Sequence, residues 1–291
     1  MKNRKFLSLI ALAMVITLAF TGCANGKTSE FDSENDITVV ARDAASGTRG
    51  AFHEIMGIIQ KQGDTQVDNL VEGALEFDGT DKVITTVEGD KYGIGYISLG
   101  SVSDRTKLAK VDGVEATIDN VKSGKYTVAR PFLLVTKGEE SELVKDFLSF
   151  AESKQGQEIT ARMKYIGAAE EPKDYTAKGI SGTIKVAGST SVTPLMEKIQ
   201  EAYKELNPEV TFEMQSNGSS QGIKAAIDGS YDIGMSSREL KEEEAGELNR
   251  YILAIDGIAV IINNENPTDS LTSQQITSIY TGEITQWSEI K

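Results

Sequence analysis

Residues 183–206 read TIKVAGSTSVTPLMEKIQEAYKEL and contain three elements in succession: a short apolar strand, a loop of small polar residues and an amphipathic helix. The helix is predicted from Leu195, Ile199 and Tyr203, which recur at helical spacing, and from Thr193-Pro194, because Pro is favoured at a first helical position. A helix start presents free backbone N–H groups and the positive end of the helix dipole, and hydroxyl side chains add further donors. The loop Ala187-Gly188-Ser189-Thr190-Ser191 is therefore typical of an anion site.

Two further loops share this composition and also lie between an apolar run and a predicted helix: Ala45-Ser46-Gly47-Thr48 and Asn217-Gly218-Ser219-Ser220. Each loop by itself could be only a helix cap, because Ser and Thr are preferred N-cap residues. Three such loops in one chain, with Arg42 four residues before Ser46, favour binding over capping. The sequence therefore predicts a site for one small anion held by many hydrogen bonds.

Apolar runs and helical stripes alternate along the chain. Strands are predicted at residues 37–41, 83–87, 92–99, 132–135, 183–186, 231–235 and 258–262. A helix marked by Leu143, Phe147 and Phe150 lies between two of them, and a polar, turn-rich tail follows the last strand. The alternation indicates an α/β fold, in which ligands gather at the carboxyl ends of strands. Ser236-Ser237-Arg238 follow one such strand.

The N-terminus has the pattern of a secretory signal: a basic start, an apolar stretch from Phe6 to Phe20, and then Thr21-Gly22-Cys23. Cys23 is the single cysteine, and its position resembles the lipobox of bacterial lipoproteins, although Phe20 stands where Leu is usual. The alternative is an ordinary signal peptide with a chance cysteine. We predict a lipoprotein signal peptide over residues 1–22, lipidation at Cys23 and a polar tether over residues 23–36. No later segment is long and apolar enough to span a bilayer.

The charge of the chain excludes some partners. The sequence has 30 basic and 44 acidic residues, and removal of Lys2, Arg4 and Lys5 with the signal leaves a net charge of −17. Nucleic acid is an unexpected partner, because phosphate backbones are held by clusters of Lys and Arg. A diffuse negative charge does not exclude a small anion, because salt screens it over about 8–10 Å and local donors decide affinity.

Several segments together resemble the phosphate-binding protein of the high-affinity ABC phosphate transporter. They are VVARDAASGTRGAF, YGIGYISLG, VAGSTSVTPLMEKI, NGSSQGIKAAI, DIGMSSREL and AIDGIAVIINNENP, and they cover nearly all of the chain after the tether. Their order differs from that usual in the family, where the AGSTS block opens the mature protein and the SGTRG block lies mid-chain. The sequence resembles a circular permutant, with a linker at residues 168–182 joining the old carboxyl and amino ends.

The resemblance implies a two-lobed periplasmic-binding-protein fold of type II, with mixed sheets flanked by helices and the ligand in a cleft between lobes. One lobe would be residues 130–255, and the other would combine 36–129 with 256–291. The hinge would fall near Arg130-Pro131 and Ile255-Asp256-Gly257, although Asp256-Gly257 could be an ordinary turn. The resemblance further implies a monomer without a cofactor, tethered by lipid at the outer face of the cytoplasmic membrane. Such a protein would capture inorganic phosphate and deliver it to an ABC permease.

The resemblance also implies the residues of the site. The expected phosphate ligands are Arg42, Ser46, Gly47 and Thr48 from one lobe, and Thr190, Ser191, Ser219 and Ser237 from the other. Arg42 supplies charge and a planar fork suited to phosphate oxygens, its alternative being an ion pair with Asp43. Many family members have Asp at the position of Ser237, and an acid at that of Ala44. Because phosphate carries a proton at neutral pH and sulfate does not, we predict that Asp256 accepts that proton.

An enzyme is the alternative from a different class. Gly218-Ser219-Ser220-Gln221-Gly222 fits the G-x-S-x-G pattern of a hydrolase nucleophile elbow, which would make Ser220 the nucleophile. The single histidine, His53, lies far upstream in a predicted helix, where a surface or packing role is more common. The sequence has no Cys cluster or His pair with metal-ligand spacing. Binding of another tetrahedral oxyanion such as sulfate or molybdate, and a role in signalling or adhesion, also remain open.

Overall fold

The computed structural model describes residues 30–62 and 65–290 of the 291-residue chain. The predicted signal peptide and the lipidation site Cys23 lie outside the described residues. From Ser33 onward the chain forms one compact unit. All of the structure discussed below belongs to this unit.

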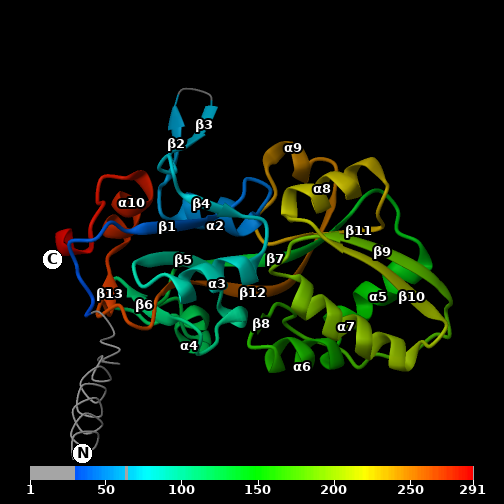
Figure 1. The fold of residues 1–291 in the computed structure, drawn as a ribbon. Coiled ribbons are helices and arrows are strands. Elements are labelled where there is room, and N and C mark those ends of the chain that lie inside the picture. Colours follow the sequence, from blue (N-terminus) through cyan, green and yellow to red (C-terminus); the bar gives the residue numbers. More distant parts are fainter. Residues whose placement is uncertain (1–29, 63–64, 291) are drawn as a thin grey trace, which may run out of the picture. The chain divides into compact units, whose positions relative to one another are not determined.

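Eleven strands form one mixed sheet, whose main path runs β10-β9-β11-β7-β12-β5-β1-β4 (Figure 1). The strands are β1 Thr38–Arg42, β2 Ile59–Gln62, β3 Thr65–Asp68, β4 Leu75–Phe77, β5 Gly93–Ser98, β6 Lys107–Val111, β7 Ala129–Thr136, β8 Ile166–Gly167, β9 Gly182–Gly188, β10 Val210–Ser216, β11 Ile233–Ser236, β12 Asn249–Ile262 and β13 Ser270–Leu271. Strands β6, β8 and β13 join beside this path, and β2 and β3 form a separate antiparallel hairpin.

Helices flank the sheet. They are α2 Gly47–Ile55, α3 Thr80–Gly89, α4 Ile118–Lys122, α5 Glu142–Glu152, α6 Lys154–Arg162, α7 Thr193–Leu206, α8 Ser219–Asp228, α9 Glu242–Ala245 and α10 Ser273–Thr281, with short 3-10 turns η1 Leu99–Ser101 and η2 Trp287–Glu289. The α/β fold predicted from the alternating pattern is confirmed, and so are the predicted helix start at Thr193-Pro194 and the strand-loop-helix order around each of the three loops.

Two sets of parallel strands meet through antiparallel partners. Strand β9 pairs in parallel with β10 and β11, while β1 pairs in parallel with β4 and β5. Strand β12 is antiparallel to β7 along its first part and to β5 along its last part. The fourteen residues of β12 therefore connect the two sets within one sheet.

The predicted strand at 83–87 is wrong, because these residues lie in helix α3. Val83, Ile84 and Val87 are β-branched, and their strand propensity suggested a buried strand. In the structure the three side chains pack together with Val40 and Ile97 in one core cluster. Their spacing is one face of a helix, so tertiary packing decides the conformation against local propensity.

Two boundaries also differ from the prediction. The predicted strand at 258–262 is the end of the much longer β12, so Asp256-Gly257 is not an ordinary turn. The tail beyond it contains helix α10, whose Thr272 side chain accepts from the backbone N–H of Gln275 while Gln275 caps in return. Thr272-x-x-Gln275 is a capping box, a signal in the sequence that predicts this helix.

The apolar cores draw on different parts of the chain. The larger cluster includes Phe147, Leu195 and Ile233 and lies among α5, α7 and the strands from β7 to β11. A smaller one joins α3 to β1 and β5, with Ile261 of β12 added to it. Both clusters reach β12, since Ala254 belongs to the larger one.

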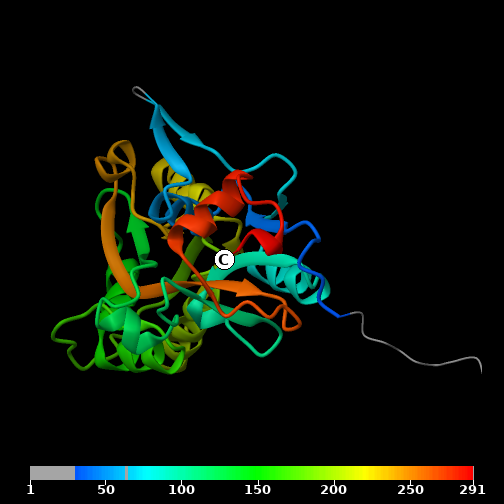
Figure 2. The same ribbon diagram turned by 90° about the vertical axis from the view of Figure 1, so that its left-hand side faces the viewer.

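The first and last described segments of the unit lie side by side. Asp36 forms a β-bridge with Gln286, the Ile37 N–H donates to the Thr285 carbonyl, and the Ser288 N–H donates to the Ser33 carbonyl. Figure 2 shows the red C-terminal segment beside the start of blue β1. Between β8 and β9, residues 168–181 contain neither helix nor strand.

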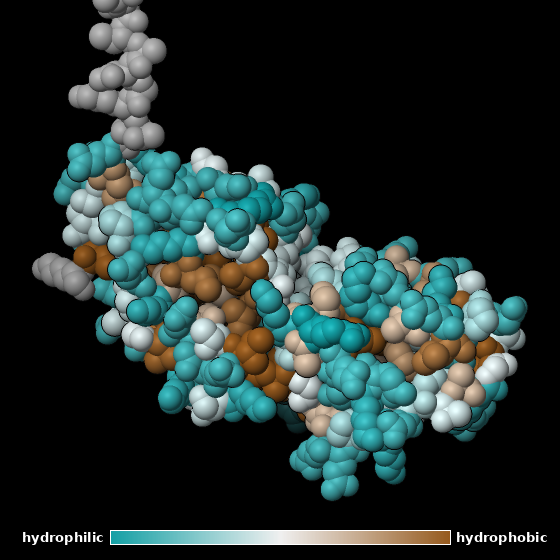
Figure 3. Space-filling model, turned by 90° about the horizontal axis from the view of Figure 1, so that it is seen from below, coloured by the Kyte–Doolittle hydropathy of each residue, from teal (hydrophilic) through white to brown (hydrophobic). Residues whose placement is uncertain are grey.

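None of the helices in the described ranges is long and apolar enough to cross a membrane. Seen from below (Figure 3), hydrophilic residues cover much of the surface, with apolar residues between them. The three exposed large apolar side chains in the described part are those of Ile55, Leu75 and Leu206.

Candidate functional site

The three Ser- and Gly-rich loops all follow the carboxyl ends of strands. Residues 43–46 connect β1 to α2, residues 189–192 connect β9 to α7, and residues 217–218 connect β10 to α8. Because β9, β10 and β11 are parallel, their ends meet at one edge of the sheet, and Ser237 after β11 joins them there. This is the edge at which open α/β sheets bind ligands.

Hydroxyl groups from these loops form one connected cluster. The Ser189 Oγ donates to the Ser237 Oγ at 2.8 Å, and the Ser237 backbone N–H donates to the Ser219 Oγ at 3.0 Å. The Thr48 Oγ1 and the Ser191 Oγ are 2.9 Å apart and share a hydrogen bond, and the Ser191 N–H joins this pair to the others by donating to the Ser189 Oγ at 3.2 Å. All five side chains are buried. We call these five residues, Thr48, Ser189, Ser191, Ser219 and Ser237, the hydroxyl cluster.

Two glycines let the first loop approach the others. A Cβ on Gly47 would overlap the Ser219 hydroxyl and crowd that of Ser237, so only the absence of a side chain permits this contact. Gly218 has a φ of +98° and lies against the backbone of Ala45. The Ser220 N–H donates to the Ala45 carbonyl at 3.1 Å. Loops separated by about 170 residues in the sequence therefore touch through their backbones.

The cap interpretation holds for the first two loops. The Ser46 Oγ accepts from the backbone N–H groups of Thr48 and Arg49 and so caps α2. The Ser189 Oγ also accepts from the backbone N–H groups of Ser191 and Val192 just before α7. Helices α7 and α8 have no side-chain cap at their N-cap residues, Val192 and Gly218. The Ser219 hydroxyl instead bonds to Ser237, which capping alone would not require.

Arg42 is buried at the end of β1 and is not the partner of a surface ion pair. Its guanidinium donates to the carbonyls of Phe77 and Asp78, to the Thr80 Oγ1 at 3.4 Å and to the Thr190 Oγ1 at 2.9 Å. Burial lowers its pKa from the ordinary value, and Coulomb repulsion from Arg130 adds to the effect. The guanidinium therefore connects the 78–80 turn with the loop that carries Thr190.

Arg130, expected only at the hinge, is a second buried guanidinium close to the cluster. Its Nη1 donates to the Ser237 carbonyl at 3.2 Å, while its Nε and Nη2 donate to Asp256 Oδ2 at 3.2 and 3.0 Å. The two residues are cross-strand partners on β7 and β12. Arg130 and Asp256 are buried because their strands pair within the sheet. Nothing in the local sequence around Arg130-Pro131 predicts this burial.

Asp256 does not point its carboxylate at the hydroxyl cluster. Its Oδ2 accepts from Arg130, and its Oδ1 accepts from the Ser98 Oγ at 2.9 Å. Burial raises the pKa of Asp256 to about 6, although the pairing with Arg130 works in the opposite direction. The link from Asp256 to the cluster thus runs through Arg130 and the Ser237 carbonyl. The structure brings the other eight expected ligands to one place and Asp256 to its border.

The residues of the enzyme alternative do not meet. The side chain of His53 bonds to Asp68 and Tyr96 and is fully buried, so of the two expected roles, surface or packing, it has the packing role. These partners leave no ring nitrogen to activate Ser220. Arg238 forms a bidentate ion pair with Glu244, the third residue of α9.

A cavity of about 770 Å³ opens beside Arg42 and Thr190. Its lining includes Asp78, Thr80, Ser216 and Asn217, which flank the guanidinium and the loops. The cavity reaches the candidate site at Thr190. No group of three or more His, Cys, Asp or Glu side chains in the described residues could hold a metal ion.

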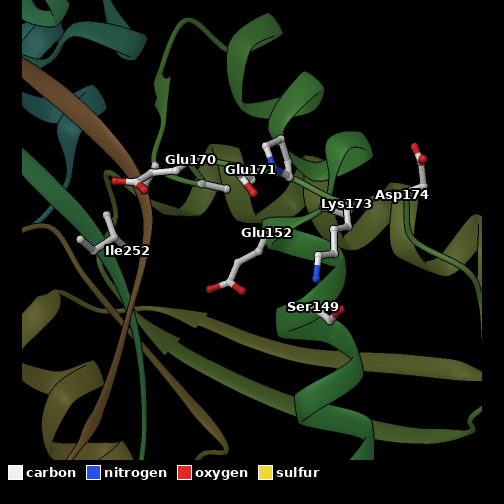
Figure 4. A pocket seen from close by; sticks show the side chains of 11 residues that line it. Ser149, Glu152, Glu170, Glu171, Lys173, Asp174 and Ile252 are labelled. Carbon is white, nitrogen blue, oxygen red and sulfur yellow. The ribbon is translucent and has the colours of Figure 1, made fainter.

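A second cavity, of about 470 Å³, lies against α5 and the 168–174 segment. Figure 4 shows carboxylates around it, from Glu152, Glu170, Glu171 and Asp174, with Lys173 as the cation among its labelled side chains. This lining repels an anion. The hydroxyl cluster, with neutral donors and Arg42, is therefore the anion-binding candidate of the two.

Comparisons with known proteins agree with one another. A family model described as a PBP superfamily domain matches residues 25–155 and 173–290. The phosphate-binding protein PstS 2 of Streptococcus pneumoniae TIGR4 is 43% identical over 292 residues, which cover both chains completely. The PstS 2 protein of Streptococcus agalactiae 2603 V/R is 43% identical over 294 residues, covering 100% of this chain and 99% of its own.

A solved structure also matches. The crystal structure of the phosphate-binding protein of a phosphate ABC transporter from S. pneumoniae TIGR4 superposes with a TM-score of 0.73 and is 45% identical. The match covers 88% of this chain and all of that one.

Proposed function

The chain belongs to the PBP superfamily and, within it, to the phosphate-binding proteins of ABC transporters, and we propose that it captures inorganic phosphate and delivers it to a membrane permease. The observation that carries this proposal is the hydroxyl cluster, in which donors from four strand ends converge beside the buried Arg42. Neutral hydroxyls, backbone N–H groups at helix starts and a guanidinium are the donors that hold a tetrahedral oxyanion.

Each expected ligand has a role in this proposal. Arg42 and Thr190 bind phosphate oxygens at the mouth of the cavity that Thr190 lines. Thr48, which follows the loop after β1, and Ser191, in the loop after β9, bind further phosphate oxygens. Ser219 and Ser237 donate from the deeper part of the cluster, where Gly47 lets the backbone approach. Ser46 orients the first turn of α2 as its cap. Phosphate would replace the bonds that the hydroxyls now make with one another.

Asp256 stays our proposed acceptor for the phosphate proton. Its pKa of about 6, raised by burial, is consistent with a carboxyl that exchanges protons near neutral pH. It would reach the ligand only if Arg130 shifts, since Arg130 lies between Asp256 and the Ser237 carbonyl. An Asp256→Asn variant that kept the full preference for phosphate over sulfate would overturn this assignment.

We also propose two lobes that close on the ligand, 130–255 and the combination of 36–129 with 256–291. Separate core clusters in these two parts, joined along β7 and β12, support the division. The neighbouring chain ends and the linker between β8 and β9 support a circular permutation, because such rearrangements need termini that are close together.

The remaining parts of the proposal concern location. A signal peptide over residues 1–22 and lipidation at Cys23 would hold the protein at the outer face of the cytoplasmic membrane, where a monomer can meet its permease. We propose no catalytic step, because its relatives are named as binding proteins and His53 is bonded elsewhere. Exclusion of a hydrolase would be tested by a Ser220→Ala variant, which should bind phosphate as the wild type does.

Calorimetric titration of the ligand-free protein with phosphate, and separately with sulfate, tests the function. Phosphate binding with little or no heat from sulfate is the expected result. Preference for sulfate or molybdate would retain the fold and overturn the ligand. Absence of binding to any oxyanion would overturn the transport proposal.

A further inference from the structure

Both backbone hydrogen-bonding groups of Arg42 are held by side chains. The Arg42 N–H donates to the Tyr96 Oη at 3.2 Å, and the Arg42 carbonyl accepts from the Arg49 Nη1 at 3.0 Å. Arg42 is the last residue of β1, where the sheet stops fixing the backbone and the site begins. These two bonds therefore set the point from which the guanidinium extends.

Tyr96 is itself oriented by a chain of buried groups. Its Oη lies 3.1 Å from the Nε2 of His53, and the Nδ1 of His53 lies 2.9 Å from Asp68 Oδ1. Tyr96 and His53 are fully buried, and the ring of Tyr96 stacks on Phe52 with a centroid separation of 4.2 Å. Neither side chain can change its partner without repacking this aromatic group.

Arg49 is oriented by the same carboxylate. Its Nε donates to Asp68 Oδ2 at 2.8 Å, and its Nη1 also pairs with Glu76. Arg49 and His53 lie four residues apart on α2, so they lie on one face of the helix. Asp68, at the end of β3, accepts from both of them and from the Leu70 N–H.

From this geometry we infer that Asp68 is a positioning residue of the anion site: it holds Tyr96 through His53, and Arg49 directly, so that both backbone groups of Arg42 are fixed. The inference rests on the proposed function of Arg42 as a phosphate ligand. Asp68 does not touch the hydroxyl cluster, and the hairpin that carries it had no part in the sequence-based site. It acts by reducing the number of conformations that Arg42 must give up on binding.

The hydrogen bonds also assign the protonation of His53. Because the Tyr96 Oη accepts from the Arg42 N–H, its own proton is available to donate to His53 Nε2. Nδ1 must then carry the ring proton, which it donates to Asp68. Burial lowers the pKa of His53, which keeps the ring neutral at physiological pH against the raising effect of Asp68.

Phosphate titrations of Asp68→Ala, Tyr96→Phe and the double variant test the inference. We expect Asp68→Ala to raise the phosphate Kd about tenfold or more. This corresponds to the loss of one to two of the hydrogen bonds that hold Arg42 in position. Tyr96→Phe should raise it less. The double variant should bind more tightly than the product of the two single effects predicts, because Asp68 acts partly through Tyr96.

Glu140→Ala is the matched control. Glu140 is also a carboxylate with three donors, from Thr136, Asn249 and Tyr251, but none of these residues contacts Arg42. It should lower thermal stability and leave the phosphate Kd unchanged. If Asp68→Ala fails to fold, Tyr96→Phe decides the matter, since it removes one oxygen and keeps the ring.

The outcomes separate the two proposals. If the wild type binds phosphate and folded Asp68→Ala binds it equally well, the positioning role is overturned and the proposed function stands. If the single effects simply multiply, the connection through His53 and Tyr96 is overturned. If the wild type binds no phosphate, both proposals fail together.

The single histidine permits a direct spectroscopic check. A nitrogen-detected spectrum of the ring should show neutral His53 with its proton on Nδ1 in the wild type, and a changed pattern in Asp68→Ala. A ring protonated on Nε2 in the wild type would overturn the assigned chain of donors.

Discussion

Gly47 is the residue at which the first loop comes closest to the serines of the other two. A methyl group there would overlap the hydroxyl of Ser219, which is anchored to Ser237. We expect Gly47→Ala to weaken phosphate binding at least about tenfold, because the loops could no longer approach to complete the hydroxyl cluster. Isothermal titration measures this effect.

Gly89→Ala is the control for that change, since an added Cβ at Gly89 meets nothing within 4 Å. Its phosphate Kd should equal that of the wild type. Equal affinity in Gly47→Ala would show that the close approach of the loops has no part in binding.

Glu140 gives a prediction for stability against pH. Burial works to raise its pKa, but hydrogen bonds from Thr136, Tyr251 and Asn249 outweigh burial and lower it to about 2, from an ordinary value of 4.5. A lowered folded-state pKa stabilises the protein above the unfolded-state value, and the contribution is lost as pH falls from about 4.5 to about 2.

We therefore expect Glu140→Gln to be less stable than the wild type by about 1 kcal/mol at neutral pH, the charge-assisted part of these bonds. Urea unfolding at several pH values measures the difference. It should shrink as the pH approaches 2, and a constant difference would contradict the assigned cause.

At the scale of single residues, the sequence predicted those residues whose role follows from the local composition. Ser, Gly and Thr between a strand and a helix indicate an anion loop, and the structure places all three loops together. Arg130, Tyr96 and Asp68 were missed because their roles depend on partners distant in the sequence: the Asp68 carboxylate pairs with Arg49 and His53 across 19 and 15 positions, and Tyr96 bonds to Arg42 across 54. No local pattern carries such pairings.

The linker between β8 and β9 contacts a buried carboxylate of α5. Tyr175 donates from its Oη to Asp146 Oδ2 at 2.5 Å, and Lys178 pairs with Asp146 Oδ1 at 3.3 Å. Asp146 is fully buried on α5 and also accepts from the Tyr203 Oη at 2.8 Å. A buried carboxylate needs these donors, so the linker completes the core beside α5 and α7.

Tyr175→Phe should accordingly lower the free energy of unfolding by about 1–2 kcal/mol, because it removes one donor from a buried charge. Chemical denaturation checks this, with Tyr231→Phe as the control at a half-buried tyrosine outside the network. Phosphate affinity should not change in either variant. If Tyr175→Phe leaves the free energy of unfolding unchanged, a water molecule replaces the lost donor.

Elements with a strong period were predictable, and those decided by tertiary packing were not. The stripe of α7 and its Pro at the helix start gave the correct boundaries, whereas 83–87 was assigned to a strand from its β-branched residues. The full length of β12 was missed because its first part pairs with β7 and its last part with β5, which a linear pattern does not reveal.

At the scale of the whole molecule, the neighbouring chain ends allow a test of the permutation. A chain that begins at Ile180, runs to Ile290, continues through a linker of about four Gly and Ser residues to Ser33 and ends at Gly179 would have the segment order that the proposed permutation implies for the unpermuted protein. All described contacts of the unit are kept, including those of Tyr175 and Lys178 with Asp146.

This rearranged chain should fold and bind phosphate within about threefold of the original, because the bridge between Asp36 and Gln286 already holds the joined ends together. Circular dichroism melting and phosphate titration give the answer. Failure to fold would show that the present order of segments is needed for the fold.

The α/β class and the convergence of the loops could be predicted before the structure, since both follow from the order of strands, loops and helices. The continuity of one sheet through β12 could not, because it is a property of pairing between distant segments. The same holds for the cavity beside Thr190, which forms only where the 78–84 segment meets the loops.

The hydroxyl cluster has a kinetic consequence for the protein as a whole. Its donors are mostly uncharged and shielded from solvent, so dissolved salt has little effect on how strongly a bound phosphate is held. The approaching dianion, in contrast, meets an acidic chain, whose net charge of −14 becomes −17 once the predicted signal peptide is removed. Rising ionic strength should speed association and leave dissociation nearly constant, so that capture becomes faster in saltier surroundings while residence time stays the same.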